Sequence, residues 1–453
     1  MSGFFSLFLV INIICMKIGS TEIVNNDWWG PEYLKAHNDT SIRPFKIEFS
    51  EEMIADLRFR LKNHRPFVPP LEGVGFEYGF NSAQMGGWLR YWAEEYPFRQ
   101  REYFLNQFPQ YTTNIQGLDI HFIRVTPKVP PGIEVVPMLL LHGWPGSVRE
   151  FYEAIPLLTS VSEHRDFALE VIIPHLPGFG FSDAAVRPGL ASNEIAVVFR
   201  NLMHRLGHKK FYIQGGDWGS ILCKSIATLF PNEVLGYHTN FAISFKPKSF
   251  LYWLLGSVYP PSVVDPSVAD RMYPITTIIM SLIQETGYFH IQSTKPDTIG
   301  IALADTPAGL LAYILQLFSV GTRKAYVYSF DGGLDNHYDR EQMIDNLMIY
   351  WMTNTITTSV RIYAEMMSLR SVISAVNEPP TPVPTWTMHA KDEIFYQSPF
   401  LLKFKYPNLV NSTILDYGGH FLALELPEVF TDDVIKAVTA FRRLQETKER
   451  FSY

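Results

Sequence analysis

The spacing of hydrophobic residues predicts a series of strands and helices in the middle of the chain. Residues 119–125 alternate between apolar and polar positions, which is typical of a half-buried strand. Residues 135–141 are a continuous apolar run, and residues 169–173 repeat this pattern apart from Glu170, as in strands buried on both faces of a parallel sheet. A helix, a strand, a helix and a strand are predicted to follow, at residues 192–206, 210–214, 220–229 and 234–239. Strands that alternate with helices indicate an α/β fold with a mostly parallel central sheet.

A second region, residues 245–377, lacks this alternation. It is aromatic and interrupted by prolines, and its pattern predicts helices, most clearly at 276–285 and 309–318. The chain then returns to two strands and a helix, predicted at residues 384–390, 411–415 and 432–446. The simplest interpretation is one α/β core with a helical cap inserted after the fourth parallel core strand.

These patterns divide the chain into five parts. The first is an apolar N-terminal membrane anchor or signal. The second is a segment rich in Trp, Pro and charged residues, helical at 50–62 and irregular at 63–75. The core follows in two halves, with the cap between them. The expected boundaries are 1–20, 21–111, 112–244, 245–377 and 378–453.

The N-terminal apolar stretch, residues 4–16, is short for a membrane span, which needs about 20 residues, and has the length of a signal-peptide core. No basic residue precedes it, and the small-residue cleavage site that follows is a poor match. A cleaved signal and a retained anchor therefore both stay open. Two Asn-x-Thr sequons, at Asn38 and Asn411, matter only if the chain enters the secretory lumen.

Composition narrows the classes of partner. The chain has 453 residues and a formal net charge of −7, and no basic run stands out, so a nucleic-acid partner is not expected. The two cysteines, Cys15 and Cys223, exclude a disulfide framework, and no His/Cys cluster has zinc spacing, so we expect no metal. The aromatic share of 14% suits a deep apolar cavity, although a large core also collects aromatic residues.

The turn after the strand at 210–214 carries the first chemical motif. It reads Gly215-Gly216-Asp217-Trp218-Gly219, the form of a nucleophile elbow, with Asp where such enzymes usually have Ser. The structural alternative is a glycine-rich turn with a solvated or N-capping Asp. A carboxylate needs no base to attack an sp³ carbon, and this attack gives an enzyme ester that water must then cleave. We expect Asp217 to be a nucleophile toward epoxides or alkyl halides.

Cleavage of that ester needs a base, which this type of fold places late in the chain. His420, in the segment Gly418-Gly419-His420-Phe421, follows the last predicted strand and precedes the last helix. The acid that orients its imidazole is expected just after the preceding strand, where Asp392 and Glu393 both stand. Spacing alone leaves these two carboxylates as alternatives.

A second loop, His142-Gly143-Trp144-Pro145-Gly146, directly follows the strand at 135–141. The backbone N–H groups of Trp144 and Trp218 are expected to converge on the oxyanion that forms when water attacks the ester. A cis peptide bond is expected before Pro145, because the turn is tight.

Four motifs together resemble the microsomal epoxide hydrolase family, which includes the insect juvenile hormone epoxide hydrolases. They are Asp27-Trp28-Trp29-Gly30-Pro31, the loop at 142–146, the turn at 215–219, and Gly418-Gly419-His420. The resemblance runs from Trp28 to the last helix. It implies an α/β-hydrolase fold whose N-terminal segment wraps around the cap and the core, and it implies no cofactor.

The resemblance also implies roles for individual residues. The family's nucleophile falls on Asp217, its general base on His420 and, in an alignment without gaps, its acid on Glu393. Asp392 stays the alternative if the loop carries a gap. Two cap tyrosines that donate hydrogen bonds to the epoxide oxygen fall on Tyr288 and Tyr363.

Relatives are held on the endoplasmic reticulum membrane by an N-terminal apolar helix, with the catalytic domain facing the cytosol. The resemblance implies the same localisation here, with the membrane as a partner of the N-terminal apolar stretch and both sequons unglycosylated.

The hypothesis is an epoxide hydrolase that uses water to convert lipophilic epoxides, xenobiotic or juvenile-hormone-like, to vicinal diols through an aspartyl ester. A haloalkane dehalogenase would also use Asp and His, but needs halide-binding donors in place of two cap tyrosines. A catalytically silent protein that binds lipophilic ligands would need none of these residues.

Overall fold

A central sheet organises the protein. The computed structural model describes residues 26–162 and 164–451, and within them nine strands form one sheet in the order β1-β2-β3-β5-β4-β6-β7-β8-β9. The strands are β1 Arg43–Phe45, β2 Gln110–Ile115, β3 Leu118–Val125, β4 Glu134–Leu141, β5 Phe167–Pro174, β6 Phe211–Gly215, β7 Val234–Thr239, β8 Thr385–His389 and β9 Leu409–Ile414. The first three pairs in this order are antiparallel and all pairs from β5 to β9 are parallel, so the expected mostly parallel sheet is confirmed.

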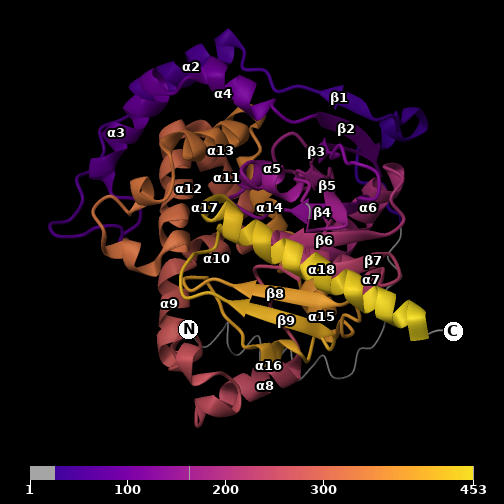
Figure 1. Cartoon of the computed structure of the whole chain (residues 1–453). Helices are drawn as coiled ribbons and strands as arrows, with labels where there is room; N and C mark the ends of the chain where they lie inside the picture. Colours follow the sequence, from indigo (N-terminus) through magenta and orange to yellow (C-terminus); the bar gives the residue numbers. More distant parts are fainter. Residues whose placement is uncertain (1–25, 163, 452–453) are drawn as a thin grey trace.

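Helices cover the two faces of this sheet (Figure 1). The 25-residue helix α18 (Pro427–Phe451) crosses one face and packs against α5 (Ala154–Leu158). Helices α6 (Ser192–Arg205) and α7 (Asp217–Leu229) pack on each other, and α7 also contacts β4, β6 and β7. Burial on both faces explains why β4, β5 and β6 read as apolar runs in the sequence.

The helical cap follows β7, the fourth parallel strand along the chain. Its α-helices are α8 Pro247–Leu255, α9 Ile275–Glu285, α10 Gly287–Thr294, α11 Pro296–Asp305, α12 Pro307–Thr322, α13 Arg340–Thr353, α14 Ile356–Met366 and α15 Leu369–Asn377. Short helical turns lie between them, at η6 Pro260–Ser262, η7 Pro266–Arg271, η8 Lys324–Tyr328 and η9 Leu334–Asn336. The insertion point matches the expected one. After β8 come α16 (Pro399–Leu402) and α17 (Leu422–Glu425).

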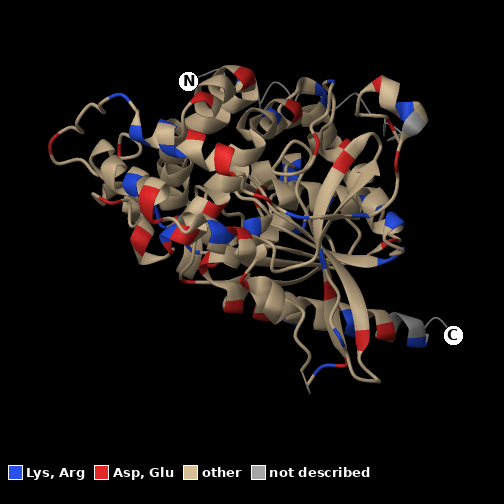
Figure 2. Cartoon of the chain, turned by 90° about the horizontal axis from the view of Figure 1, so that it is seen from above, with Lys and Arg blue, Asp and Glu red and all other residues tan. Residues whose placement is uncertain are grey.

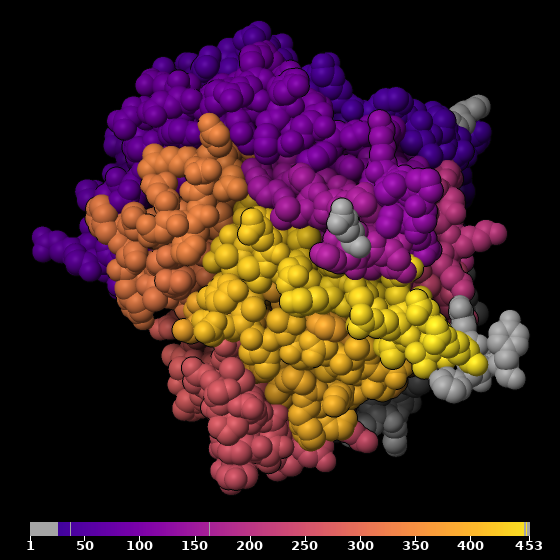
Figure 3. Space-filling model, viewed as in Figure 1, coloured from indigo at the N-terminus to yellow at the C-terminus, as the bar shows by residue number. Residues whose placement is uncertain are grey.

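The segment from residue 26 to the start of β2, which includes β1, arches over the cap and the first part of the core and is indigo to violet in Figure 1. It contains η2 Glu32–His37, α2 Glu51–Lys62, η3 Ser82–Gln84, α3 Met85–Arg90, η4 Tyr91–Glu95 and α4 Phe98–Leu105. In the space-filling view, the yellow C-terminal residues lie at the centre of the face shown, with the orange part of the cap at the left and the pink part below (Figure 3). Acidic and basic residues are interspersed along the chain in Figure 2.

A buried ion cluster joins the N-terminal segment, the core and the cap. Asp345 of α13 has no exposed surface and accepts hydrogen bonds from Arg101 of α4, from Arg149 and from the Tyr96 hydroxyl. Arg149 lies in η5 (Val148–Phe151), a short helix just after β4, and is itself buried. A buried charge is tolerated when it is paired and hydrogen-bonded, so this cluster fixes the three parts to one another.

One hairpin was not expected from the sequence. Strand β2 pairs with β3 through a turn at Gln116 and Gly117, both of which have positive φ values, 53° and 89°. Such a turn is usually marked by Asn-Gly or Asp-Gly, whereas this one is Gln-Gly. Strand β2 is largely polar and lies next to the sheet edge, so its hydrophobic pattern is also weak.

The N-terminal apolar stretch and Cys15 lie outside the described residues. Within the described part, no single helix is long and apolar enough to cross a membrane. Helices α11 and α12, which are bent relative to each other, reach the length and apolar composition of a membrane span only when they are taken together.

Candidate active site

The turn between β6 and α7 holds Asp217 in a constrained backbone conformation. Asp217 is the first residue of α7 and has a φ of +46°, in the left-handed region that residues with a side chain rarely adopt. A Cβ on Gly219 would lie 2.0 Å from the Leu141 carbonyl oxygen, and one on Gly143 would lie 2.2 Å from Asp217 Oδ1. These glycines are therefore needed for the close approach of the two loops, as expected for a nucleophile elbow.

The two oxygens of the Asp217 carboxylate have different partners. Oδ1 accepts a hydrogen bond of 2.8 Å from the backbone N–H of Trp144. Oδ2 lies 3.5 Å from Nε2 of His420. The peptide bond between Trp144 and Pro145 is cis, as expected from the tight turn. One oxygen is thus held by a backbone donor, while the other faces the imidazole.

Of the two candidate acids, Glu393 is the one that contacts the imidazole of His420. His420 Nδ1 donates a hydrogen bond of 2.6 Å to Glu393 Oε1, and this oxygen also accepts a bond from the backbone N–H of Ile394. Glu393 and His420 are both buried, whereas Asp392 lines the wall of the neighbouring pocket. The histidine is further fixed through its backbone N–H, which donates to the carbonyl of Gly321 on α12.

The electrostatics of the cluster favour a charged imidazole. Burial lowers the pKa of His420, but the carboxylates of Glu393 and Asp217 together raise that pKa well above its ordinary value. His420 is therefore held as a cation between two anions while Asp217 is ionised. Any reaction that removes the charge of Asp217 also removes part of this stabilisation, and so lowers the pKa of His420.

Two cap tyrosines lie above this group. Tyr288 of α10 stacks on the Trp144 indole with ring centroids 5.6 Å apart, and Tyr363 of α14 meets the same indole edge-on at 5.7 Å. Burial, reinforced by the negative charge of Asp217, raises the pKa of both phenols. Both hydroxyls therefore stay protonated at neutral pH and can act as hydrogen-bond donors.

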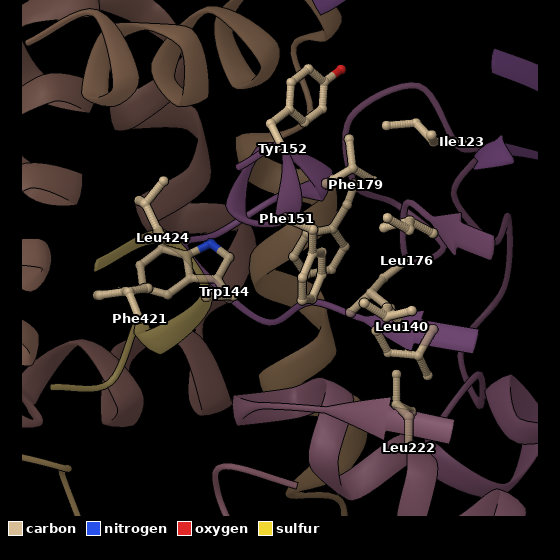
Figure 4. Close-up of a cluster of buried hydrophobic side chains, with 14 of the residues drawn as sticks. Ile123, Leu140, Trp144, Phe151, Tyr152, Leu176, Phe179, Leu222, Phe421 and Leu424 are labelled. Atoms are coloured by element: carbon tan, nitrogen blue, oxygen red, sulfur yellow. The ribbon is translucent and has the colours of Figure 1, made fainter. Parts of the chain in front are cut away.

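A pocket that is open to solvent leads to these residues. Residues of α9, α10 and α12 line it together with the loops of the core, and among them are Leu282, Tyr288, Leu317, Trp144 and His420. Part of the apolar cluster beneath it is drawn in Figure 4, from Leu222 and Leu140 in the core to Trp144 and Phe421 near the site. Such a lining suits an apolar ligand.

A smaller cavity adjoins the carboxylate. It is lined by Gly143, Trp144, Glu150, Gly216, Asp217, His420 and Phe421, and it has room for about one water molecule. Glu150 was not selected from the sequence, because a Glu four residues beyond Gly146 looks like an ordinary surface charge. Only the fold brings its carboxyl next to Asp217 and His420.

The structure thus brings together Asp217, His420, Glu393, Trp144, Tyr288 and Tyr363. The Trp218 indole meets the Tyr363 ring at 4.8 Å. The backbone N–H of Trp218 lies in the first turn of α7, where N–H groups have no acceptor within the helix, and its part in an oxyanion hole stays a prediction. In the described part of the chain, no group of three or more His, Cys, Asp or Glu side chains could hold a metal ion.

Comparisons with known sequences agree with this geometry. The family described as "Epoxide hydrolase N terminus" matches residues 42–151, and the one described as "alpha/beta hydrolase fold" matches residues 136–251. The juvenile hormone epoxide hydrolase of Bombyx mori is 56% identical over 422 residues, which are 93% of this chain and 92% of that protein. Epoxide hydrolase 1 of Sus scrofa is 40% identical over 425 residues, which are 92% of this chain and 93% of that protein.

Solved structures give the same result. The crystal structure of juvenile hormone epoxide hydrolase from the silkworm Bombyx mori matches with a TM-score of 0.92 at 57% identity, over 93% of this chain and 99% of that one. The Aspergillus niger epoxide hydrolase, 24% identical, matches with a TM-score of 0.73 over 90% of this chain and 98% of that one, and it shares the fold. The α/β-hydrolase fold is confirmed.

The pairing of His420 with Glu393 can be tested through the pKa of the imidazole. In Glu393→Gln that pKa should fall, because an opposite charge in direct contact is lost. In Asp392→Asn the pKa of His420 should change far less, since Glu393 rather than Asp392 bonds to the ring. The measurement is NMR titration of protein labelled with ¹³C at histidine, with His420→Gln to assign the signal. Equal shifts in the two variants would show that the acid is assigned wrongly.

Proposed function

Because the chain belongs to the microsomal epoxide hydrolase family, which includes the juvenile hormone epoxide hydrolases, we propose that it opens lipophilic epoxides to vicinal diols through an ester of Asp217. One observation carries this proposal: Oδ1 of Asp217 is held by a backbone N–H while Oδ2 faces His420, which is paired with Glu393. A carboxylate held in this way has one oxygen for attack and one for an oxyanion.

In the first step, Oδ2 of Asp217 attacks a carbon of the epoxide and the ring C–O bond breaks. The electron pair of that bond goes to the ring oxygen, which takes a proton from a tyrosine hydroxyl. Tyr288 and Tyr363 are suited to this role, because both phenols are protonated and both flank Trp144 beside the nucleophile. Donors placed where negative charge develops lower the barrier.

In the second step, water attacks Cγ of the ester and gives a proton to Nε2 of His420. Formation of the ester has removed the charge of Asp217, so the pKa of His420 falls and its neutral form can act as a base. The oxyanion forms on Oδ1, where the Trp144 N–H already donates and where the Trp218 N–H is proposed to donate as well. The Cγ–Oδ2 bond then breaks, and the diol leaves with a proton from His420. The Asp217 carboxyl that remains is protonated, and its proton goes through solvent to the tyrosinate left by the first step, which restores both groups.

The pocket supports a lipophilic substrate. Its walls include Leu282, Leu317, Ile394 and Phe421, and the epoxide-binding end is closed by aromatic rings. Identity to the juvenile hormone epoxide hydrolase of Bombyx mori, 56%, exceeds the 40% identity to epoxide hydrolase 1 of Sus scrofa. An epoxide-bearing isoprenoid is therefore the substrate that we propose first, with xenobiotic epoxides as the alternative.

The ester mechanism predicts a trapped intermediate. In His420→Gln, attack by Asp217 should still occur but hydrolysis should stop, so the protein gains the mass of one substrate molecule on the Asp217 peptide. The measurement is mass spectrometry after incubation with an isoprenoid epoxide or with a small aromatic epoxide, and Asp217→Ala is the control that should gain no mass. Modification of another residue, or of none, would contradict the mechanism. Release of halide from an alkyl halide, without any reaction of epoxides, would favour a dehalogenase.

The role of the tyrosines predicts a loss in the first step. Tyr288→Phe and Tyr363→Phe should each slow ester formation about 10²-fold, because each removes a donor to the departing oxygen. Tyr313→Phe is the matched control, since Tyr313 also meets the Trp144 ring but its hydroxyl donates to Gln292. Single-turnover rates measured by rapid quench check this. The assignment fails if the three variants behave alike.

We further propose that the N-terminal apolar stretch, residues 4–16, holds the protein on the endoplasmic reticulum membrane with the catalytic domain in the cytosol. The full chain should then resist alkaline extraction from membranes, and a chain that starts at residue 21 should not. The sequon at Asn411 is exposed on β9, so a lumenal domain would carry a glycan there. Extraction at high pH or a glycan on Asn411 would contradict this topology.

A further inference from the structure

Glu150 occupies a special position beside the proposed nucleophile. It lies in η5, four residues after Gly146, and its side chain lines the small cavity that Asp217 and His420 also line. Its carboxyl lies over Gly146, where a Cβ would come within 3.1 Å of Glu150 Oε2. The cavity has room for about one water molecule. Glu150 thus stands where a water molecule has access both to the imidazole and to the Asp217 carboxylate.

The backbone that carries Glu150 is held firmly by the cap helix α13. The neighbouring Arg149 is buried, and it donates to Asp345 at 2.8 Å and to Glu153 at 2.7 Å. On the other side, Asn346 Nδ2 donates to the Pro145 carbonyl, and the Tyr350 hydroxyl donates to the Gly146 carbonyl. A side chain on such a support can orient a small ligand with little loss of entropy.

The Glu150 carboxyl has no protein partner that would explain its place. Among the described residues, no hydrogen bond or ion pair of this carboxyl is found, whereas Glu153 on the next turn pairs with Arg149. Glu150 is half-buried, and water in the cavity can supply a hydrogen-bonding partner for its carboxyl.

We propose that Glu150 binds and orients the water molecule that cleaves the Asp217 ester. This inference deepens the proposed function and rests on its ester intermediate. One hydrogen of the water is donated to the Glu150 carboxylate and the other to Nε2 of His420, which leaves an oxygen lone pair directed at Cγ of Asp217. When that oxygen attacks, the proton moves to His420 and the electron pair of the ester carbonyl moves to Oδ1. Glu150 gains no proton and keeps the water in place.

The charges that surround Glu150 act on its pKa in opposite directions. Burial raises the pKa of Glu150 to about 7; positive charge on His420 opposes this, while Asp217 and Glu393 add to it. At the ester stage two of these charges are lost together: the negative charge of Asp217, which raises the pKa of Glu150, and the positive charge of His420, which lowers it. Both forms of the carboxyl can accept a hydrogen bond from water, because the protonated form keeps its carbonyl oxygen as an acceptor.

The test separates the two chemical steps. In Glu150→Ala, hydrolysis of the ester should slow about 10-fold or more, while ester formation stays within about threefold of the wild-type rate. The ester on Asp217 should therefore accumulate during turnover of an isoprenoid epoxide. Glu150→Gln should lose less, because its amide oxygen still accepts a hydrogen bond from water. Rapid quench and mass spectrometry of the Asp217 peptide give both rates.

Glu153→Gln is the matched control, because it removes a carboxylate from the same segment but outside the cavity. It should leave the ratio of the two rates unchanged. If Glu150→Ala hydrolyses the ester at the wild-type rate, or if both steps slow equally, the proposal is overturned. The proposed function itself fails on a different result, the absence of any Asp217 ester even in His420→Gln.

Discussion

Two carboxylates that share one buried imidazole are the constraint around which the site is built. Asp217 and Glu393 face opposite nitrogens of His420, and either anion without this partner would be costly to bury. The arrangement is possible because Asp217 has a positive φ and glycines allow the two loops of the core to touch. It also couples the steps of the proposed reaction: esterification of Asp217 removes one anion, and the imidazole can then act as a base.

The cap is part of this arrangement rather than a separate cover. It supplies Tyr288 and Tyr363, and the Gly321 carbonyl of α12 accepts a hydrogen bond from the backbone N–H of His420. Helix α13 holds the loop that bears Trp144 and Glu150, and Asp345 of the same helix joins that loop to the N-terminal segment. Three parts of the chain that are far apart in sequence therefore position the reacting groups together.

Much of this could be predicted from sequence. The order of apolar strands and the glycines of two short motifs predicted Asp217 and Trp144, because an elbow at the end of a buried strand has few alternatives. The position of His420, after the last predicted strand and before the last helix, predicted its role as the base. Spacing did not distinguish Asp392 from Glu393 as the acid, since the sequence does not show which way the side chains of two neighbouring loop residues point. In the structure, the Glu393 side chain points to the imidazole. The tyrosines came from the family resemblance alone. Glu150 was not predicted from the sequence, because its place beside Asp217 and His420 depends on a cavity formed by residues distant in sequence.

The most direct test of the central claim is a single turnover of a lipophilic epoxide in ¹⁸O-water with enzyme in excess. Mass spectrometry then locates the label in the Asp217 peptide and in the diol. An aspartyl ester that is cleaved at Cγ places ¹⁸O in the Asp217 carboxylate and leaves the diol unlabelled. Label in the diol together with an unlabelled Asp217 would mean that water attacks the epoxide directly, which would contradict the account.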